Sequence, residues 1–319
     1  WGLAWLARSV ELRGRPCALM IGHLEHSSID KAWWDAQLSR CVDRTWYAQS
    51  WVLDIASPGW NAMVDREREA LMPLTWRSRM GIRYLHQPFG LQQLGVFAPT
   101  RDQVLVNAVL SAVPAQYRYW DIYLHEAMTD VPIGRTEPCT QQVLDVLHDT
   151  EAQRAGYSQG HRRNLRKAEA ARELLTWEVD ASTFTGLFRS TTAARYGVPE
   201  RSLVMMHDLI VAGIDRGEIR IIGLKEHGVL QAAACFVEWD GRAILLKSAS
   251  NARGQELHAM FLLIDEYLAT AGADIRLLDF AGSNTPSVAR FNAGFGARST
   301  VYLRLLRNAL PVPLRWLKR

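Results

Sequence analysis

The pattern of apolar residues is clearest between residues 242 and 306. Four consecutive apolar residues at 243–246 predict a strand, and small residues at 248–254 predict a loop. Beyond the loop the apolar residues are three or four positions apart, which predicts a helix over 255–271 with one buried face. The apolar residues of that face are Leu257, Met260, Phe261, Ile264 and Leu268.

A second strand and a second helix follow this first pair. The expected elements are a strand at 275–280, a turn at 281–284, a helix that ends at Gly294 and a strand at 300–305. The order strand, loop, helix, strand indicates a crossover unit. Its loops bring backbone N–H groups and helix N-termini together, which favours anion binding. The alternative is that the glycines of these loops serve only as turns.

The two halves of the chain show the same order of elements. In the first half we expect helices at 29–41, 50–56 and 101–113, and strands at 45–48, 60–65, 70–75, 81–85, 117–124 and 140–147. In the second half, before the crossover helix, we expect helices at 157–172, 184–195 and 202–216, and strands at 174–179, 219–224, 230–238 and 242–247. This order predicts an α/β (α+β) protein whose halves join near 148–155.

The composition is typical of a soluble globular protein. The 319 residues suffice for one large or two ordinary domains, with 48% hydrophobic and 22% charged residues. A net charge of +4 permits an anionic ligand without requiring nucleic acid. The four cysteines form no C-x-x-C pair, which argues against a disulfide framework or a structural zinc site. No apolar run reaches the roughly 18 residues of a membrane span, so we expect a cytoplasmic protein with no membrane segment and no metal.

Three polar residues stand near the strand ends of the crossover unit. Asp279 lies in the second strand, Ser283 follows in the turn, and Lys247 ends the preceding strand. A carboxylate there can act as a base or hold a substrate amine, and a lysine can pair with a carboxylate or phosphate. We therefore treat all three as candidate catalytic residues. The alternatives are that Asp279 caps a turn and that Lys247 is solvated.

Two further groups are candidates for substrate binding. The helix at 157–172 is strongly basic, and Arg162 and Arg166 share one face of it. They form either a clamp for the phosphates of a nucleotide-containing substrate or a solvated charged face. The second group combines aromatic and amide side chains that suit a pocket wall or, for the aromatic ones, the core. Its members are Tyr47, Trp51, Gln87, Gln92, Gln93 and Tyr196.

Several motifs together resemble one known family. LDFAGS at 278–283 with VARFNAGFGA at 288–297, and YSQGHRRNLRKA at 157–168, resemble the FemAB-like branch of the GNAT-type acyltransferase superfamily. WYAQSW, MPL, QPF and QQLGVF in the first half, at 46–51, 72–74, 87–89 and 92–97, are similar to that branch too. The resemblance spans about residues 29 to 306.

This resemblance implies two tandem GNAT-like domains, each a mixed, mostly antiparallel sheet flanked by helices. We place them at 20–150 and 151–319, with residues 1–19 as an extension of little role. The resemblance also implies a donor site, for which the candidates are Asn251, Arg253, Gly254, Phe291 and Asn292. The loop at 251–254 departs from the family's pyrophosphate-binding loop, since it has one glycine instead of two. Asn292 stands where peptidoglycan-building members carry a lysine.

The function that the resemblance implies is N-acyl or aminoacyl transfer. An acyl-CoA or an aminoacyl-tRNA would be the donor and a small-molecule amine the acceptor, with tRNA as a partner in the second case. The alternative is a non-catalytic protein that keeps the cleft to bind a ligand or RNA. The single glycine in the loop and Asn292 are the features that keep this alternative open.

Overall fold

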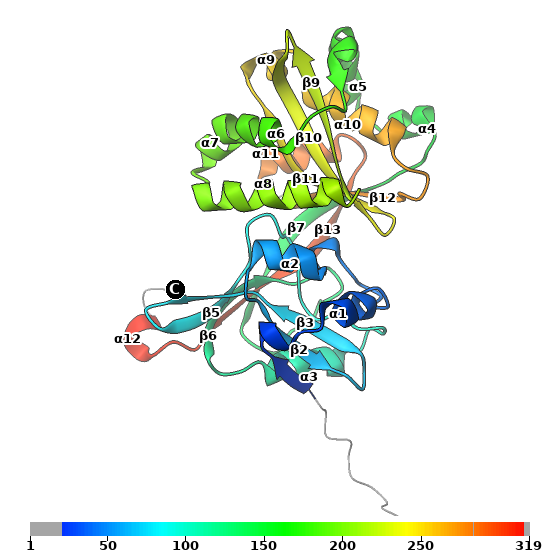
Figure 1. Ribbon diagram of the computed structural model, residues 1–319. Helices are drawn as coiled ribbons and strands as arrows, with labels where there is room; N and C mark the ends of the chain where they lie inside the picture. Colours follow the sequence, from blue (N-terminus) through cyan, green and yellow to red (C-terminus); the bar gives the residue numbers. More distant parts are fainter. Residues whose placement is uncertain (1–20, 283, 316–319) are drawn as a thin grey trace, which may run out of the picture.

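The computed structural model describes residues 21–282 and 284–315, and it has two lobes joined by long strands (Figure 1). The predicted extension at 1–19 and Ser283 lie outside the described residues. The strands are β1 (Ile21–Leu24), β2 (Asn61–Asp65), β3 (Ala70–Leu74), β4 (Trp76–Arg79), β5 (Ile82–His86), β6 (Tyr117–Tyr123), β7 (Arg135–Asp145), β8 (Leu175–Thr176), β9 (Ile219–Glu226), β10 (Val229–Trp239), β11 (Arg242–Ser250), β12 (Leu277–Gly282) and β13 (Arg298–Asn308). The α-helices are α1 (Lys31–Leu38), α2 (Ser50–Ala56), α3 (Gln103–Ala112), α4 (Thr150–Ala155), α5 (Gln159–Ala168), α6 (Ala181–Phe188), α7 (Ala194–Tyr196), α8 (Glu200–Asp215), α9 (Ala252–Glu256), α10 (Ala259–Thr270), α11 (Pro286–Ala293) and α12 (Val312–Arg315).

One large mixed sheet runs through both lobes. Its strand order is β4-β5-β6-β13-β7-β12-β11-β10-β9-β8, and a separate sheet has the order β1-β2-β3. In the first half, β5 pairs antiparallel with β4 and parallel with β6, and β13 closes the series antiparallel to β6. In the second half, β11 pairs antiparallel with β10 and parallel with β12, and β7 closes the series antiparallel to β12.

The two lobes therefore share one sheet topology, and each is completed by a strand from the other half of the chain. The prediction of two tandem units with mixed sheets and flanking helices is confirmed. Because β7 and β13 also pair with each other, the exchange makes the sheet continuous from lobe to lobe. A domain boundary near residue 150 would separate each lobe from the strand that completes it. The predicted boundary therefore stays a prediction.

Strand β10 shows why the upper lobe forms as it does. Its apolar residues are nearly continuous, as expected of a strand with both faces covered. On one face, Ala233 and Cys235 join the core beneath α6 and α8; on the other, Ala234 and Phe236 join the core beneath α10. The first of these cores extends into the lower lobe, where it includes side chains of α1 and α2.

Some predicted elements differ from the observed ones. Residues 45–48 are not a strand: Trp46–Ala48 forms a 3₁₀ helix, and the indole of Trp46 donates a hydrogen bond of 2.8 Å to Glu218 of the other lobe. The helix expected at 255–271 is divided by His258, whose φ is +52°. Strand β4 was not predicted, because its exposed sequence WRSR lacks an apolar pattern.

Candidate active site

A cavity of about 700 Å³ lies where the parallel strands β11 and β12 separate. The pairing of these strands ends at Ile244 and Asp279. The next residues of both strands, 245–248 and 280–282, line the cavity. Strand separation thus opens a space in the middle of the sheet, at the place where the sequence predicted the two loops of the crossover unit.

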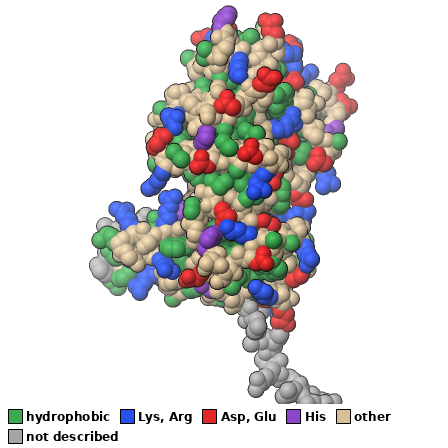
Figure 2. All heavy atoms as spheres, viewed as in Figure 1, with side chains coloured by type: hydrophobic (Ala, Val, Ile, Leu, Met, Phe, Trp, Pro, Cys, Tyr) green, Lys and Arg blue, Asp and Glu red, His purple; other side chains and the backbone are tan. Residues whose placement is uncertain are grey.

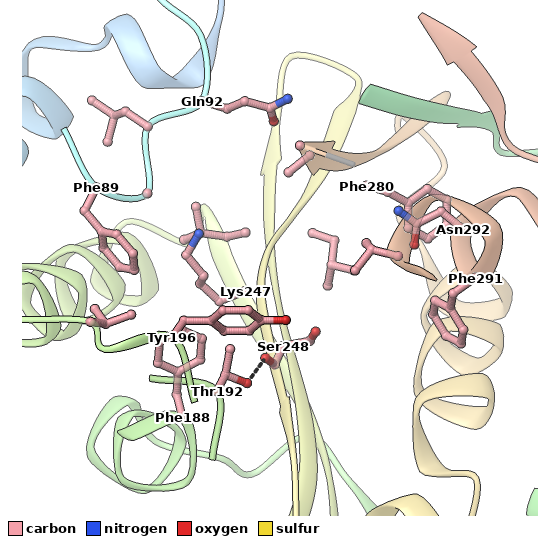
Figure 3. Close-up of a pocket in the computed structure, with 18 of the residues that line it drawn as sticks. Phe89, Gln92, Phe188, Thr192, Tyr196, Lys247, Ser248, Phe280, Phe291 and Asn292 are labelled. Carbon is pink, nitrogen blue, oxygen red and sulfur yellow. Dashed lines mark hydrogen bonds between the residues drawn. The ribbon is translucent and has the colours of Figure 1, made fainter. Parts of the chain in front are cut away.

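Both lobes contribute to the walls of this cavity (Figure 3). The lower lobe supplies the loop after β5, and the upper lobe supplies α6, α10 and α11 as well as the two strands. Most lining side chains are apolar, including Phe89, Leu91, Phe188, Val198, Met260, Phe280 and Phe291. Among the described residues, no carboxylate or imidazole lines the cavity. It therefore suits a ligand with a substantial apolar part and few charges.

Lys247 brings a positive charge into these apolar walls. Its ammonium lies 5.0 Å from the centroid of the Phe89 ring, an arrangement that permits a cation–π interaction. No described residue forms an ion pair or a hydrogen bond with it. The side chain is half-buried, and burial lowers the pKa of the ammonium. An ammonium in apolar surroundings without a counterion is costly, so this site favours an anionic group on the ligand.

Gln92 and Tyr47 also line the cavity, and each has a polar atom without a partner. The buried oxygen of the Gln92 amide and the hydroxyl of Tyr47 form no hydrogen bond within the described part of the chain. Tyr47 is 3% exposed, and burial raises the pKa of its hydroxyl well above the usual value. Both atoms are covered by the surrounding side chains, so they are unpaired polar groups behind the wall and not contacts that the wall offers.

Asp279 lies outside this cavity. It is buried, its carboxylate accepts a hydrogen bond of 2.7 Å from Arg242, and it also accepts one from the backbone N–H of Ala281. Burial raises the pKa of this carboxyl, and the Arg242 guanidinium opposes the shift. Asp279 lines a second cavity of about 250 Å³, which shares Tyr47 with the first and also contacts Gln93.

The side chains of the predicted donor loop at 251–254 are engaged with other groups of the protein. The Asn251 side chain accepts from the N–H of Gly254 and so caps α9. Arg253 forms ion pairs with Glu226 and Glu256 at 2.7 and 3.3 Å. None of the three residues of this loop lines the large cavity, whereas Phe291 and Asn292 of the predicted donor site do.

The remaining substrate candidates are divided between the cavity and other places. Tyr196 lines the cavity. Trp51 packs against Trp46 and the guanidinium of Arg216, and Gln87 bonds to the backbone of its own loop and of β6. Arg162 donates to the carbonyl groups of residues 155 and 157, which caps the preceding turn. Arg166 is exposed on α5, and the face of the molecule in Figure 2 carries interspersed charges of both signs.

Sequence reasoning missed part of the wall. Phe188 and Thr192 line the cavity together with Tyr196, and their spacing of four residues places them on one side of a helical segment. This spacing could have identified Phe188 and Thr192 as neighbours of Tyr196 from the sequence. The contribution of Ser287 could not be read from the sequence, because it depends on how α11 sits against β12.

No metal site and no membrane-spanning helix is found in the residues that the structure describes. No group of three or more His, Cys, Asp or Glu side chains there could hold a metal ion. No helix of the described ranges is long and apolar enough to cross a membrane.

Comparisons with known proteins agree with this geometry. Residues 154–286 match the family described as an acetyltransferase (GNAT) domain. Among solved structures, FemX superposes with a TM-score of 0.62 at 13% identity, over 91% of this chain and 98% of that one. A tandem GNAT protein from the clavulanic acid biosynthesis pathway has a TM-score of 0.53 at 16% identity, over 91% and 99%. The C-terminal domain of a putative lysylphosphatidylglycerol synthetase from Agrobacterium fabrum has a TM-score of 0.51 at 14% identity, over 90% and 95%.

A comparison with curated protein sequences finds no match. The structural likenesses, all at low identity, concern the fold. The family match confirms the GNAT part of the predicted resemblance for residues 154–286 and supports an acyltransferase, and the fold shared with FemX agrees with the FemAB-like branch. On its upper-lobe side, the cavity between β11 and β12 is lined by matched residues and by four residues of α11 that follow the match, Ser287, Val288, Phe291 and Asn292.

Proposed function

On the premise that residues 154–286 form a GNAT acetyltransferase domain within a FemAB-like tandem fold, we propose that the protein is an N-acyltransferase. It joins an activated acyl group to an amine in the cavity between β11 and β12. The observation that carries this proposal is the separation of two parallel strands, which opens a space of about 700 Å³ lined by both lobes. A cavity of this size, lined by both lobes, has room for an acyl group and an amine side by side.

The reaction in this cavity is the aminolysis of a thioester. The neutral amine nitrogen attacks the acyl carbon, the bond from carbon to sulfur breaks, and the thiol leaves with the proton that the amine gives up. The apolar walls keep water away from the acyl group, so that hydrolysis does not compete. With no carboxylate or imidazole on the described part of the wall, holding the two reactants in position is the main contribution.

A coenzyme A thioester fits the surroundings of the cavity better than an aminoacyl-tRNA. A smaller cavity of about 160 Å³ shares Thr192, Ser248 and Met260 with the large one, and it is lined by polar side chains. At its edge stands Arg195, an exposed guanidinium without an ion pair in the described residues. This groove can hold a chain that ends in phosphates. The basic side chains of α5, which an RNA would contact, do not line either cavity.

The direct test is to measure thiol release from acyl-CoA esters in the presence of primary amines, with mass spectrometry of the amide product. Ser287 lines the cavity from the first turn of α11. We expect Ser287→Trp to fill part of the cavity and to lower turnover by about tenfold or more. Ser182 occupies the same position in the first turn of α6, outside the large cavity, so Ser182→Trp is the matched control and should retain activity. If no acyl-CoA yields thiol and amide with any amine, the proposed function is wrong.

A second prediction concerns the phosphates of the donor. Arg195→Ala should weaken the binding of coenzyme A by roughly tenfold, because a charge-assisted hydrogen bond is lost. Arg253→Ala should change it by less than about threefold, because two carboxylates already engage that guanidinium at the surface. Calorimetry measures the affinity of both variants for coenzyme A. A larger loss of affinity in Arg253→Ala than in Arg195→Ala would show that the loop at 251–254 binds the phosphates.

A further inference from the structure

The charge in the cavity limits what the acceptor can be. Lys247 is the source of this charge, and it has no counterion among the described residues. A phosphate dianion would require several donors, such as a second cation or a row of backbone N–H groups. The described lining contains no second Lys, Arg or His. A carboxylate carries one negative charge and therefore matches one ammonium.

A chain of side-chain amides determines which atom of Gln92 has no hydrogen-bond partner. The Glu126 carboxylate can only accept hydrogen bonds, so Gln141 directs its NH₂ group to it, at 2.6 Å. The oxygen of Gln141 then faces the lower lobe, where it accepts from the NH₂ groups of Gln92 and Gln93. Since the NH₂ group of Gln92 is engaged in this way, its oxygen is the atom left without a partner.

The wall thus carries an unpaired cation, and an unpaired hydrogen-bond acceptor lies buried behind it. Figure 3 shows that Lys247 and Gln92 enter the cavity from different elements, Lys247 from β11 and Gln92 from the loop of the lower lobe. Most of the remaining wall is aromatic or aliphatic. A complementary molecule carries a carboxylate and an apolar side chain.

We propose that the acceptor is an amino acid with an apolar side chain, whose carboxylate pairs with Lys247 and whose amine is the group that is acylated. This inference rests on the proposed function for the fate of the amine, whereas the binding itself does not depend on it. Lys247 is a specificity residue in this arrangement. The lowered pKa of its ammonium agrees with the assignment, because a bound carboxylate relieves the cost of an unpaired charge.

The test uses two matched sets of probes in calorimetry with the full chain. One set is L-phenylalanine, phenethylamine and 3-phenylpropanoate; the other is L-leucine, isopentylamine and 4-methylpentanoate. In at least one set, we expect the amino acid to bind roughly tenfold or more tightly than the molecule that lacks its carboxylate, as for a lost charge-assisted hydrogen bond. Equal binding of amine and amino acid in both sets, or no saturable binding of either amino acid at millimolar concentration, would overturn the proposal.

Variants test the contact with Lys247. Lys247→Met keeps the length of the side chain, and it should abolish the advantage of the amino acid over the amine. Lys225→Met, on β9 and outside the cavity, is the control and should bind as the unaltered protein does. If Lys247→Met retains the full preference for the carboxylate, the assignment to Lys247 is wrong.

Two readouts keep the inference separate from folding and from the proposed function. Lys247→Met removes an unpaired ammonium, so its melting temperature should equal or exceed that of the unaltered protein. If the amino acid binds but no acyl-CoA reacts, only the proposed function fails. If amines without a carboxylate are acylated as readily as amino acids, only this inference fails.

Discussion

Replacing Asp279 by asparagine is expected to destabilise the protein by about 3 kcal/mol or more, the range for removing one partner of a buried ion pair. The side chain of Asp279 is 3% exposed, and its partner Arg242 is 27% exposed. Asparagine keeps the shape and still accepts from the N–H of Ala281. It removes the charge that balances Arg242, which among the described residues then retains Glu126, at 3.2 Å, as its ion-pair partner.

A nearby ion pair provides the control for this prediction. Asp240 pairs with Arg44 at 2.6 Å, but its side chain is 40% exposed, so Asp240→Asn should cost less than about 1 kcal/mol. Chemical denaturation of both variants gives the comparison. Suppose instead that Asp279→Asn melts normally while turnover falls about 10²-fold. Asp279 would then take a proton or hold the amine, as the sequence suggested, and the expectation that its role is structural would be wrong.

The second large effect is expected at Gly294, where alanine should destabilise the protein by about 3 kcal/mol. A Cβ at this position would overlap the ring of His161. That ring cannot move aside easily. Its Nε2 donates to the carbonyl of Phe291 at 2.8 Å, its Nδ1 accepts from the Ser158 hydroxyl at 3.1 Å, and the Phe261 and Phe295 rings pack against it.

Gly160 is the matched control for Gly294. It lies in the first turn of α5, where the nearest atom to an added Cβ is the Ser158 oxygen at 3.9 Å. Gly160→Ala should leave stability unchanged or raise it by up to about 1 kcal/mol, because alanine favours the helix. Thermal unfolding of the two variants measures both effects. A normal melting temperature for Gly294→Ala would show that His161 is free to move.

The contact at Gly294 also explains why two motifs that resemble one family occur together. The segments at 157–168 and 288–297 are far apart in the chain, yet Tyr157 packs edge-on against Phe295 with their ring centroids 5.1 Å apart. The backbone N–H of Ser158 donates to the carbonyl of Gly294. Some residues of the two motifs therefore hold α5 against α11, and His161 of the basic helix is one of them.

The sequence by itself determined most of the elements and their order. Periodic apolar positions located α3, α8 and the meander β9–β11, because burial on one or two faces leaves a local trace in the chain. The repeated order of elements indicated two units with a common sheet, which the pairing of β5 with β6 and of β11 with β12 confirms. The sequence also singled out Lys247, Tyr47 and Tyr196, which the fold brings to one cavity.

Only the tertiary structure decided which charged groups have partners. Asp279 and Lys247 looked alike in the sequence, as polar residues near strand ends, but Arg242 neutralises the first and no described residue neutralises the second. The sequence suggested that Arg253 was free to bind a ligand, but Glu226 at the end of β9 forms an ion pair with it. The exchange of β7 and β13 between the lobes was equally hidden. Each of these results depends on contacts between residues distant in the chain, for which local periodicity carries no signal.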